Sequence, residues 1–186
     1  MEIVICNSHD IKLSSIKKDG VSSFRIQFDV KNPHYNLNNA IGFDLFDLLG
    51  ELNKDTIEES YIEKYDDTTK IVISGLIFKQ IGKDFGITQK YMFSTIEKVS
   101  IEQDVFRFVL SQIDKPSSIH VPKEAESIIK SSSALDIKLV DSHHAIFVYL
   151  FSIEFAEDIP SHMDNMPGLL MKKIFFRLKH FLDNIV

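Results

Sequence analysis

The stretch LDIKLVDSHHAIFVYLFSIEF, residues 135–155, decides the fold of this chain. Two runs rich in apolar residues flank the short polar connection DSHH, and this pattern predicts a β-hairpin. The second run, residues 145–155, is long and nearly all apolar, which is typical of a central strand in a sheet covered on both faces. We therefore expect a sheet to be the framework of the molecule.

The first third of the chain repeats this pattern. The runs EIVIC and IKLSSIK precede the turn KDG at residues 18–20, and VSSFRIQFDV follows with apolar and polar residues in alternation. A period of two indicates a half-buried strand, and an Asp-Gly pair favours a hairpin turn. Further along, TTKIVISGLIF at residues 68–78 is rich in β-branched residues and predicts a buried strand. Residues 55–67 fit either a helix or an edge strand.

Helical spacing of apolar residues predicts helices over residues 41–52, 100–113 and 167–186. A fourth helix is predicted over residues 121–130, where Pro122 stands at a position that a first helical turn tolerates. Asn38 or Asn39 would cap the first helix, and Ser100 with Gln103 would form a capping box for the second. The sequence thus predicts an α+β fold, with an antiparallel or mixed sheet, packed helices and a C-terminal amphipathic helix.

The length of the chain suits a single domain over residues 1–186, with a weak possible division near residues 114–118. Its one cysteine, Cys6, cannot form an internal disulfide, and the longest apolar stretch, residues 145–156, is too short to span a bilayer. The first residues do not read as a signal peptide. We therefore expect a soluble, cytoplasmic protein.

The sequence leans against catalysis. It has no phosphate-binding glycine loop, no G-x-G-x-x-G, no H-E-x-x-H and no G-x-S-x-G, and a single cysteine excludes zinc sites built from thiolates. We therefore expect no cofactor and no resident metal.

The segment FKQIGKDFGITQKYMFSTIEKV, residues 78–99, carries the strongest motif. Its first half fits a helix, Gly86 stands where a turn needs a positive φ, and Thr88 would cap a second helix. In IGKDFGIT the segment resembles the helix-turn-helix of bacterial transcription regulators and sigma factors, which implies DNA binding by the exposed side of the second helix. That side would comprise Thr88, Gln89, Lys90, Tyr91 and Ser94. The alternative interpretation is a strand, a glycine-bounded turn and a core helix, and a net charge of −6 favours it.

Two softer signals concern metal chemistry. Asp136 and Lys138 share one face of a predicted strand, an arrangement that metal-dependent nucleases use beside a second acid. Several loop residues could also hold a divalent metal if the chain brings them together, which the sequence leaves open. These residues are His143, His144, His162 and Asp164.

The distribution of charge and apolar surface favours a binding function. Residues 44–67 hold nine acidic residues, whereas residues 172–186 are basic, and the C-terminal helix is more apolar than one sheet contact requires. We therefore expect a non-catalytic protein-interaction or adaptor domain that binds a protein partner or a second copy of itself. The expected interface comprises Lys172, Lys173, Phe175, Phe176 and Arg177.

The alternative function is a DNA-binding regulator that uses residues 78–99, and the third is a metal-dependent nuclease or another enzyme with a non-standard site. Membrane binding is not expected, because the apolar residues of the C-terminal helix interleave with lysines instead of segregating from them.

Overall fold

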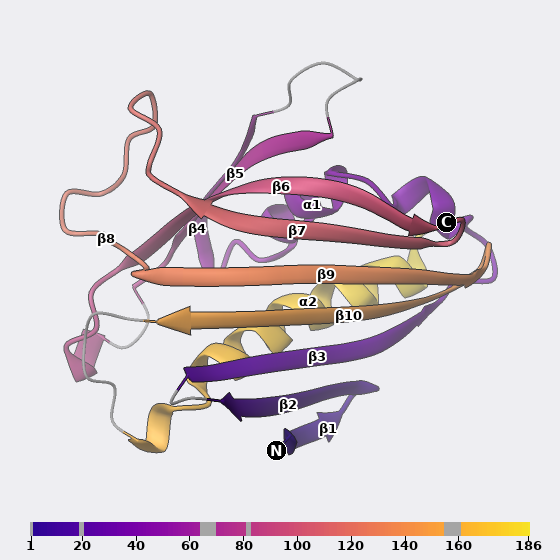
Figure 1. The fold of residues 1–186 in the computed structure, drawn as a ribbon, viewed down its shortest axis with the longest axis horizontal. Helices are drawn as coiled ribbons and strands as arrows, with labels where there is room; N and C mark the ends of the chain where they lie inside the picture. The colour runs from indigo at the N-terminus through magenta and orange to yellow at the C-terminus, as the bar shows by residue number, and fades with distance from the viewer. Residues whose placement is uncertain (1, 19–20, 64–69, 81–82, 155–160) are drawn as a thin grey trace.

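A computed structural model describes residues 2–18, 21–63, 70–80, 83–154 and 161–186 (Figure 1). The strands are β1 (Glu2–Ser8), β2 (Ile11–Lys18), β3 (Val21–Lys31), β4 (Ile57–Glu63), β5 (Ile71–Phe78), β6 (Lys90–Glu102), β7 (Val105–Ile113), β8 (Glu126–Ser127), β9 (Lys130–Asp141) and β10 (His144–Glu154). The helices are α1 (Asp44–Leu52), α2 (Met166–Asn184) and the short 3₁₀ turns η1 (Leu37–Ala40), η2 (Lys83–Phe85) and η3 (Ser161–Met163).

The described strands form one sheet in the order β1-β2-β3-β10-β9-β7-β6-β5-β4. Neighbours along this path are antiparallel, and the short β8 lies parallel to β6. In the middle of the sheet β3 pairs with β10, with Phe28 opposite Phe147. The N-terminal strands therefore join directly to the hairpin formed by β9 and β10, as Figure 1 shows.

The core lies on one face of the sheet, beneath α2. Side chains alternate between the two faces of a strand, so β3 and β10 each send every second residue inward. The inward residues of these strands are Phe24, Ile26, Phe28, Val30, Ala145, Phe147, Tyr149 and Phe151, all buried. From α2 they meet Ile174, Phe175, Leu178 and Leu182. The fold is thus α+β, with a large antiparallel sheet and a C-terminal helix against it.

The first turn of α2 approaches β3 very closely. A Cβ built at Gly168 would lie 2.6 Å from the Cδ1 atom of Phe24, far inside van der Waals contact. A side chain at this position would push the helix away from the sheet. Gly168 therefore lets the start of α2 rest on the Phe24 ring.

The strands predicted in the first third of the chain and in the hairpin of residues 135–155 are confirmed over the described residues. Residues 2–8, 11–18 and 21–31 are strands, and so are residues 130–141 and 144–154. The predicted turn at residues 18–20 falls partly outside the described residues. Of residues 55–67, which fit either a helix or an edge strand, residues 57–63 form the edge strand β4, and residues 64–67 lie outside the described residues.

Both predicted amphipathic helices at residues 41–52 and 167–186 exist, although α1 begins at Asp44. The predicted cap, Asn38 or Asn39, is wrong, because Phe43 stands at the N-cap of α1 and makes no side-chain cap hydrogen bond. The side chain of Asn36 instead caps η1, where it accepts the backbone N–H of Asn38. The prediction that the second strand of the C-terminal hairpin is covered on both faces is also wrong. Its outward side chains are partly exposed, and Leu150 is 38% exposed.

Three predicted helices are strands instead. Residues 88–99 and 100–113 fall mostly in β6 and β7, and residues 121–130 contain β8 and the start of β9. The apolar residues that predict a helix over residues 100–113 stand four apart, and they are Ile101, Val105, Val109 and Ile113. Four is an even number, so the same spacing also keeps residues on one face of a strand. The local prediction at Gly86 is confirmed, since its φ is +74°, but a strand follows it.

Residues 114–118, where the sequence allows a division, connect β7 to β8, and both strands belong to the same sheet.

Within the described ranges, neither helix combines the length and apolarity needed to cross a bilayer.

Candidate ligand-binding cavity

A cavity lies between the inner face of the sheet and the two α-helices. It contains about 730 Å³ of space free of protein atoms, its opening to solvent included. Its floor consists of inward residues of β5, β6, β7, β9 and β10. Its helical side is formed by Phe46, Leu49, Met171, Ile174 and Phe175. Residues from most of the chain therefore contribute to one enclosure.

The lining of this cavity is apolar with a few hydroxyls. Most lining side chains are aliphatic or aromatic, the polar ones are serines and Tyr149, and none of the lining residues that the structure describes is charged. Such a lining favours an apolar ligand and offers a small number of neutral hydrogen-bonding groups to orient it.

Tyr149 stays neutral at physiological pH. Burial raises the pKa of its hydroxyl to about 12, although a hydrogen bond with Ser133 opposes this shift. Its ring centroid lies 5.1 Å from that of Phe151 and 4.7 Å from that of Phe175. The three rings fix one side of the cavity without adding charge.

A second pocket adjoins the first, with about 530 Å³ of space that again includes its opening. The two share Phe78, Ile153 and Met171 in their linings. The second pocket also receives Lys90, which is only 6% exposed. Its Nζ donates to Glu126 at 3.0 Å and to Thr88 Oγ1 at 2.7 Å, so a carboxylate already balances this charge.

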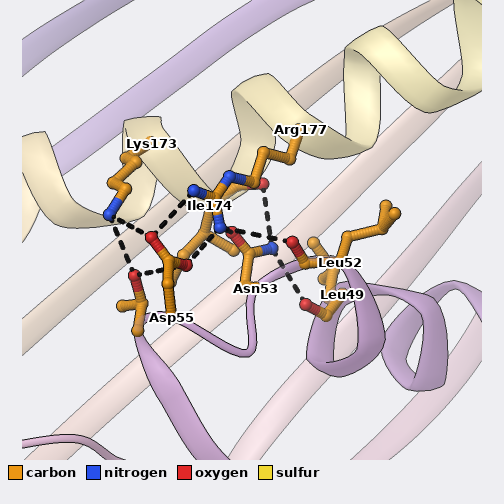
Figure 2. A network of polar contacts seen from close by, with 8 residues as sticks. Leu49, Leu52, Asn53, Asp55, Lys173, Ile174 and Arg177 are labelled. Carbon is orange, nitrogen blue, oxygen red and sulfur yellow. Dashed lines mark hydrogen bonds and ion pairs between the residues drawn. The ribbon is translucent and has the colours of Figure 1, made fainter.

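A polar cluster fastens α2 beside the cavity (Figure 2). Lys173 Nζ and Arg177 Nη2 each lie 2.8 Å from Asp55 Oδ2, and Arg177 Nη1 donates to Asp55 Oδ1. Asn53 is buried and its amide donates to the carbonyls of Leu49 at 2.9 Å and of Ile174 at 3.3 Å. The connection between α1 and β4 thereby holds the middle of α2.

This cluster explains part of the uneven charge of the sequence. Asp55 belongs to the acidic segment at residues 44–67, whereas Lys173 and Arg177 belong to the basic end of the chain. These opposite charges meet within one molecule and hold its helix in place.

Acidification is expected to weaken this cluster. Hydrogen bonds from Arg177, and then from Lys173, hold the pKa of Asp55 far below its usual value of about 4. A carboxyl whose pKa is lowered by folding contributes its full stabilisation above that usual value, and loses it as the pH falls further. Because the Asp55 side chain is 46% exposed, we expect a contribution of only about 1 kcal/mol.

The measurement is urea unfolding of the parent and of Asp55→Asn at about pH 7 and about pH 3. The variant should be less stable at the higher pH, and the difference should shrink at the lower one. Glu102→Gln, at an exposed position on β6, is the control and should change stability equally little at both values. A difference between parent and Asp55→Asn that is the same at both pH values would contradict the role of this carboxylate.

The residues predicted to read DNA do not form an exposed helical face. Lys90, Tyr91 and Ser94 belong to the strand β6, and Ser94 lies inside the cavity. Gln89 donates to the carbonyl of Phe78 at 2.9 Å and to Glu58 at 2.6 Å, and Thr88 donates to Glu126 at 2.8 Å. These residues instead connect β6 to its neighbours.

The residues predicted to form a partner interface also point in different directions. Phe175 is buried against the sheet, whereas Phe176 is 37% exposed and its ring meets that of His9. Lys173 and Arg177 bind Asp55, and Lys172 Nζ donates to Ser8 Oγ at 2.5 Å. The helix is unusually apolar because its inner side faces both the sheet and the cavity.

The residues considered for metal chemistry have other roles. Asp136 binds the guanidinium of Arg107 at 2.6 and 2.7 Å, and His144 Nε2 lies 2.9 Å from Asp29. His143 Nδ1 lies 2.9 Å from the carbonyl oxygen of Asn32. His162 and Asp164 lie in and just after η3. Across the part of the chain that the structure describes, no group of His, Cys, Asp or Glu could hold a metal ion.

Sequence reasoning missed the cavity itself. Its serines include Ser74 on β5, Ser94 on β6, and Ser131 and Ser133 on β9, and they form no motif. The one available signal was the excess of apolar residues on the C-terminal helix, which was attributed to a partner.

Comparison with known proteins identifies the fold. No protein-family model and no curated protein matches this sequence. A STAR-related lipid transfer protein fragment from Xanthomonas axonopodis superimposes with a TM-score of 0.76 at 11% identity, covering 98% of this chain and 99% of that one. The lipid transfer and protein localization domain of human StarD13 gives 0.70 at 10% identity, covering 100% and 90%. Human StAR-related lipid transfer protein 5 gives 0.69 at 9% identity, covering 98% and 84%.

This likeness corrects the functional predictions made from sequence. A self-associating adaptor, a DNA-binding regulator and a metal-dependent nuclease are all contradicted by a lipid-transfer fold that encloses an apolar cavity. The partners expected for those functions, protein or nucleic acid, are contradicted with them. At these low identities the comparison establishes architecture: this chain has the fold of StAR-related lipid transfer proteins.

Proposed function

We propose that this protein binds a lipid or a similar hydrophobic molecule in the cavity beneath α2. The observation that carries the proposal is the cavity itself, which is apolar and which no charged residue lines within the part of the chain that the structure describes. The fold, shared with proteins described as lipid transfer proteins, supports the same function.

The energetics suit a ligand with a long hydrocarbon portion. Each methylene group transferred from water into an apolar site contributes about 0.8 kcal/mol. About ten methylenes therefore supply roughly 8 kcal/mol, from which the cost of immobilising the ligand is subtracted. We expect dissociation constants of about 1–100 µM for single-chain ligands and lower values for larger ones.

In this proposal the ligand enters the main cavity through the second pocket. It opens beside the first turns of α2, at Met166, Pro167 and Leu170, and meets the main cavity at Met171. The Asp55 cluster holds α2 farther along, at Lys173 and Arg177. Displacement of the start of the helix would widen the passage while the middle of the helix stays fastened.

Binding of diphenylhexatriene, an uncharged hydrocarbon dye that fluoresces in apolar surroundings, tests this proposal. The protein is first freed of bound lipid by reverse-phase chromatography and refolded, and the extract is analysed by mass spectrometry. We expect saturable binding of about one dye molecule per chain, with competition by long-chain lipids. Absence of saturable binding by a refolded protein with a native circular dichroism spectrum would refute the proposal.

A further inference from the structure

Two serines lie side by side on the floor of the cavity. Ser74 on β5 and Ser94 on β6 are directly paired in the sheet, so their Cβ atoms are about 5 Å apart. Both line the cavity, next to the cross-strand pair of Leu76 and Met92 on the same two strands. One polar group of a ligand could thus reach both hydroxyls.

These hydroxyls have unused hydrogen-bonding capacity. Ser94 is only 3% exposed, and within the described ranges no side-chain hydrogen bond joins Ser74 or Ser94 to another residue. The other inward serines differ, because Ser133 bonds to Tyr149 and Ser131 to Gln112. A ligand that bonds to one of these hydroxyls gains a hydrogen bond without breaking one inside the protein.

The surroundings of the two serines disfavour a charged ligand. A carboxylate or phosphate moved into this cavity would lose its hydration without meeting a cation, since none of the described lining residues is charged. The nearby Lys90, in the adjoining pocket, is already paired with Glu126. Lys79 also lines that adjoining pocket, and neither lysine is among the residues that line the main cavity.

We infer that the ligand carries an uncharged hydrogen-bonding group, a hydroxyl or a carbonyl, and that Ser74 and Ser94 bind this group. The inference rests on the proposed function and narrows it to a class of neutral lipids. The apolar part of the ligand extends toward the aromatic rings of Tyr149, Phe151 and Phe175, and the polar group lies on β5 and β6.

Competition against diphenylhexatriene with three ligands of equal chain length tests the inference. The ligands are 1-decanol, 1-chlorodecane, which lacks the hydroxyl, and decanoate, which is charged. The proteins are the parent, the double variant Ser74→Ala/Ser94→Ala and the control Ser111→Ala. Ser111 is an exposed serine on β7, in the same sheet.

The double variant should bind 1-decanol about 3- to 10-fold more weakly than the parent, the loss expected for one or two neutral hydrogen bonds. Its affinities for the dye and for 1-chlorodecane should stay within about twofold of the parent, because neither ligand has a hydroxyl or carbonyl that could hydrogen-bond with a serine. Ser111→Ala should match the parent with all ligands. The parent should bind decanoate at least about tenfold more weakly than 1-decanol.

The outcomes separate this inference from the proposed function. Equal affinities of parent and double variant for 1-decanol, with dye binding intact, would overturn the role of the two serines and leave lipid binding standing. Decanoate binding as tightly as 1-decanol would overturn the restriction to neutral ligands. Failure of every protein to bind the dye would refute the proposed function itself.

Discussion

Replacement of Phe175 by alanine is expected to lower the free energy of unfolding by about 3–5 kcal/mol. Phe175 is 1% exposed, and its ring centroid lies 5.9 Å from that of Phe28 and 4.7 Å from that of Tyr149. Truncation removes these contacts and enlarges a cavity that already exists, so the surrounding residues cannot close the gap. Urea unfolding followed by circular dichroism measures the change.

The adjacent Phe176 provides a matched control for this experiment. It is the same residue type on the same helix, but it is 37% exposed and touches mainly His9 and His180. We expect Phe176→Ala to cost less than about 1 kcal/mol. Equal losses for the two variants would contradict the packing of α2 described above. An apolar ligand should partly restore the stability of Phe175→Ala, because binding to the folded state alone raises its stability.

A tryptophan at position 171 is expected to reduce the affinity for apolar ligands by about tenfold or more. Met171 is the α2 residue that lines both pockets and helps join them, along with Phe78 and Ile153. The indole ring of tryptophan is larger than the methionine side chain, so it fills the passage and excludes part of the ligand. Each methylene group of the ligand that is excluded from the cavity loses about 0.8 kcal/mol of binding free energy. Titration with diphenylhexatriene measures the loss, and circular dichroism confirms that the variant remains folded.

Leu169→Trp is the matched control for the blocked passage. Leu169 lies two residues earlier on the same helix and is 48% exposed. We expect this variant to bind the dye within about twofold of the parent. The chain contains no tryptophan, so each variant has a single indole whose emission reports its surroundings. Emission from position 171 should be blue-shifted relative to position 169, and equal dye affinities of the two variants would place the ligand elsewhere.

Alternation of apolar residues made the strand β3 predictable, because a period of two has no helical equivalent over its length. The strand β10 was predictable from its long, nearly all apolar run after a short polar connection. The C-terminal helix was predictable for the corresponding reason, because its buried residues follow a helical period.

Residues 88–113 could not be assigned in this way. Their apolar residues recur at intervals of four, which both a helix and a strand place on one side. The structure decides between them through tertiary context: β6 lies between β5 and β7, and β7 pairs with β9 as well. Only the sheet partners, which are distant in sequence, distinguish the two interpretations.

The cavity was unpredictable for a different reason. Ser74, Ser94 and Met171 are ordinary residues at their positions, and each is compatible with a core or with a surface. Their role arises because the packing of α2 leaves space above the sheet at these positions. Space left between packed elements has no signature in a single sequence.

The pairing of β3 with β10 also bears on how the molecule assembles. Phe28 and Phe147 are partners across the sheet and about 120 residues apart in the chain. Contacts of such separation form slowly, because loop-closure entropy must be overcome first. During synthesis on the ribosome, the edge of β3 that pairs with β10 therefore remains unpaired until residues 144–154 have emerged. The time during which a nascent chain exposes an unpaired, aggregation-prone strand edge is thus set by the pairing of β3 with β10.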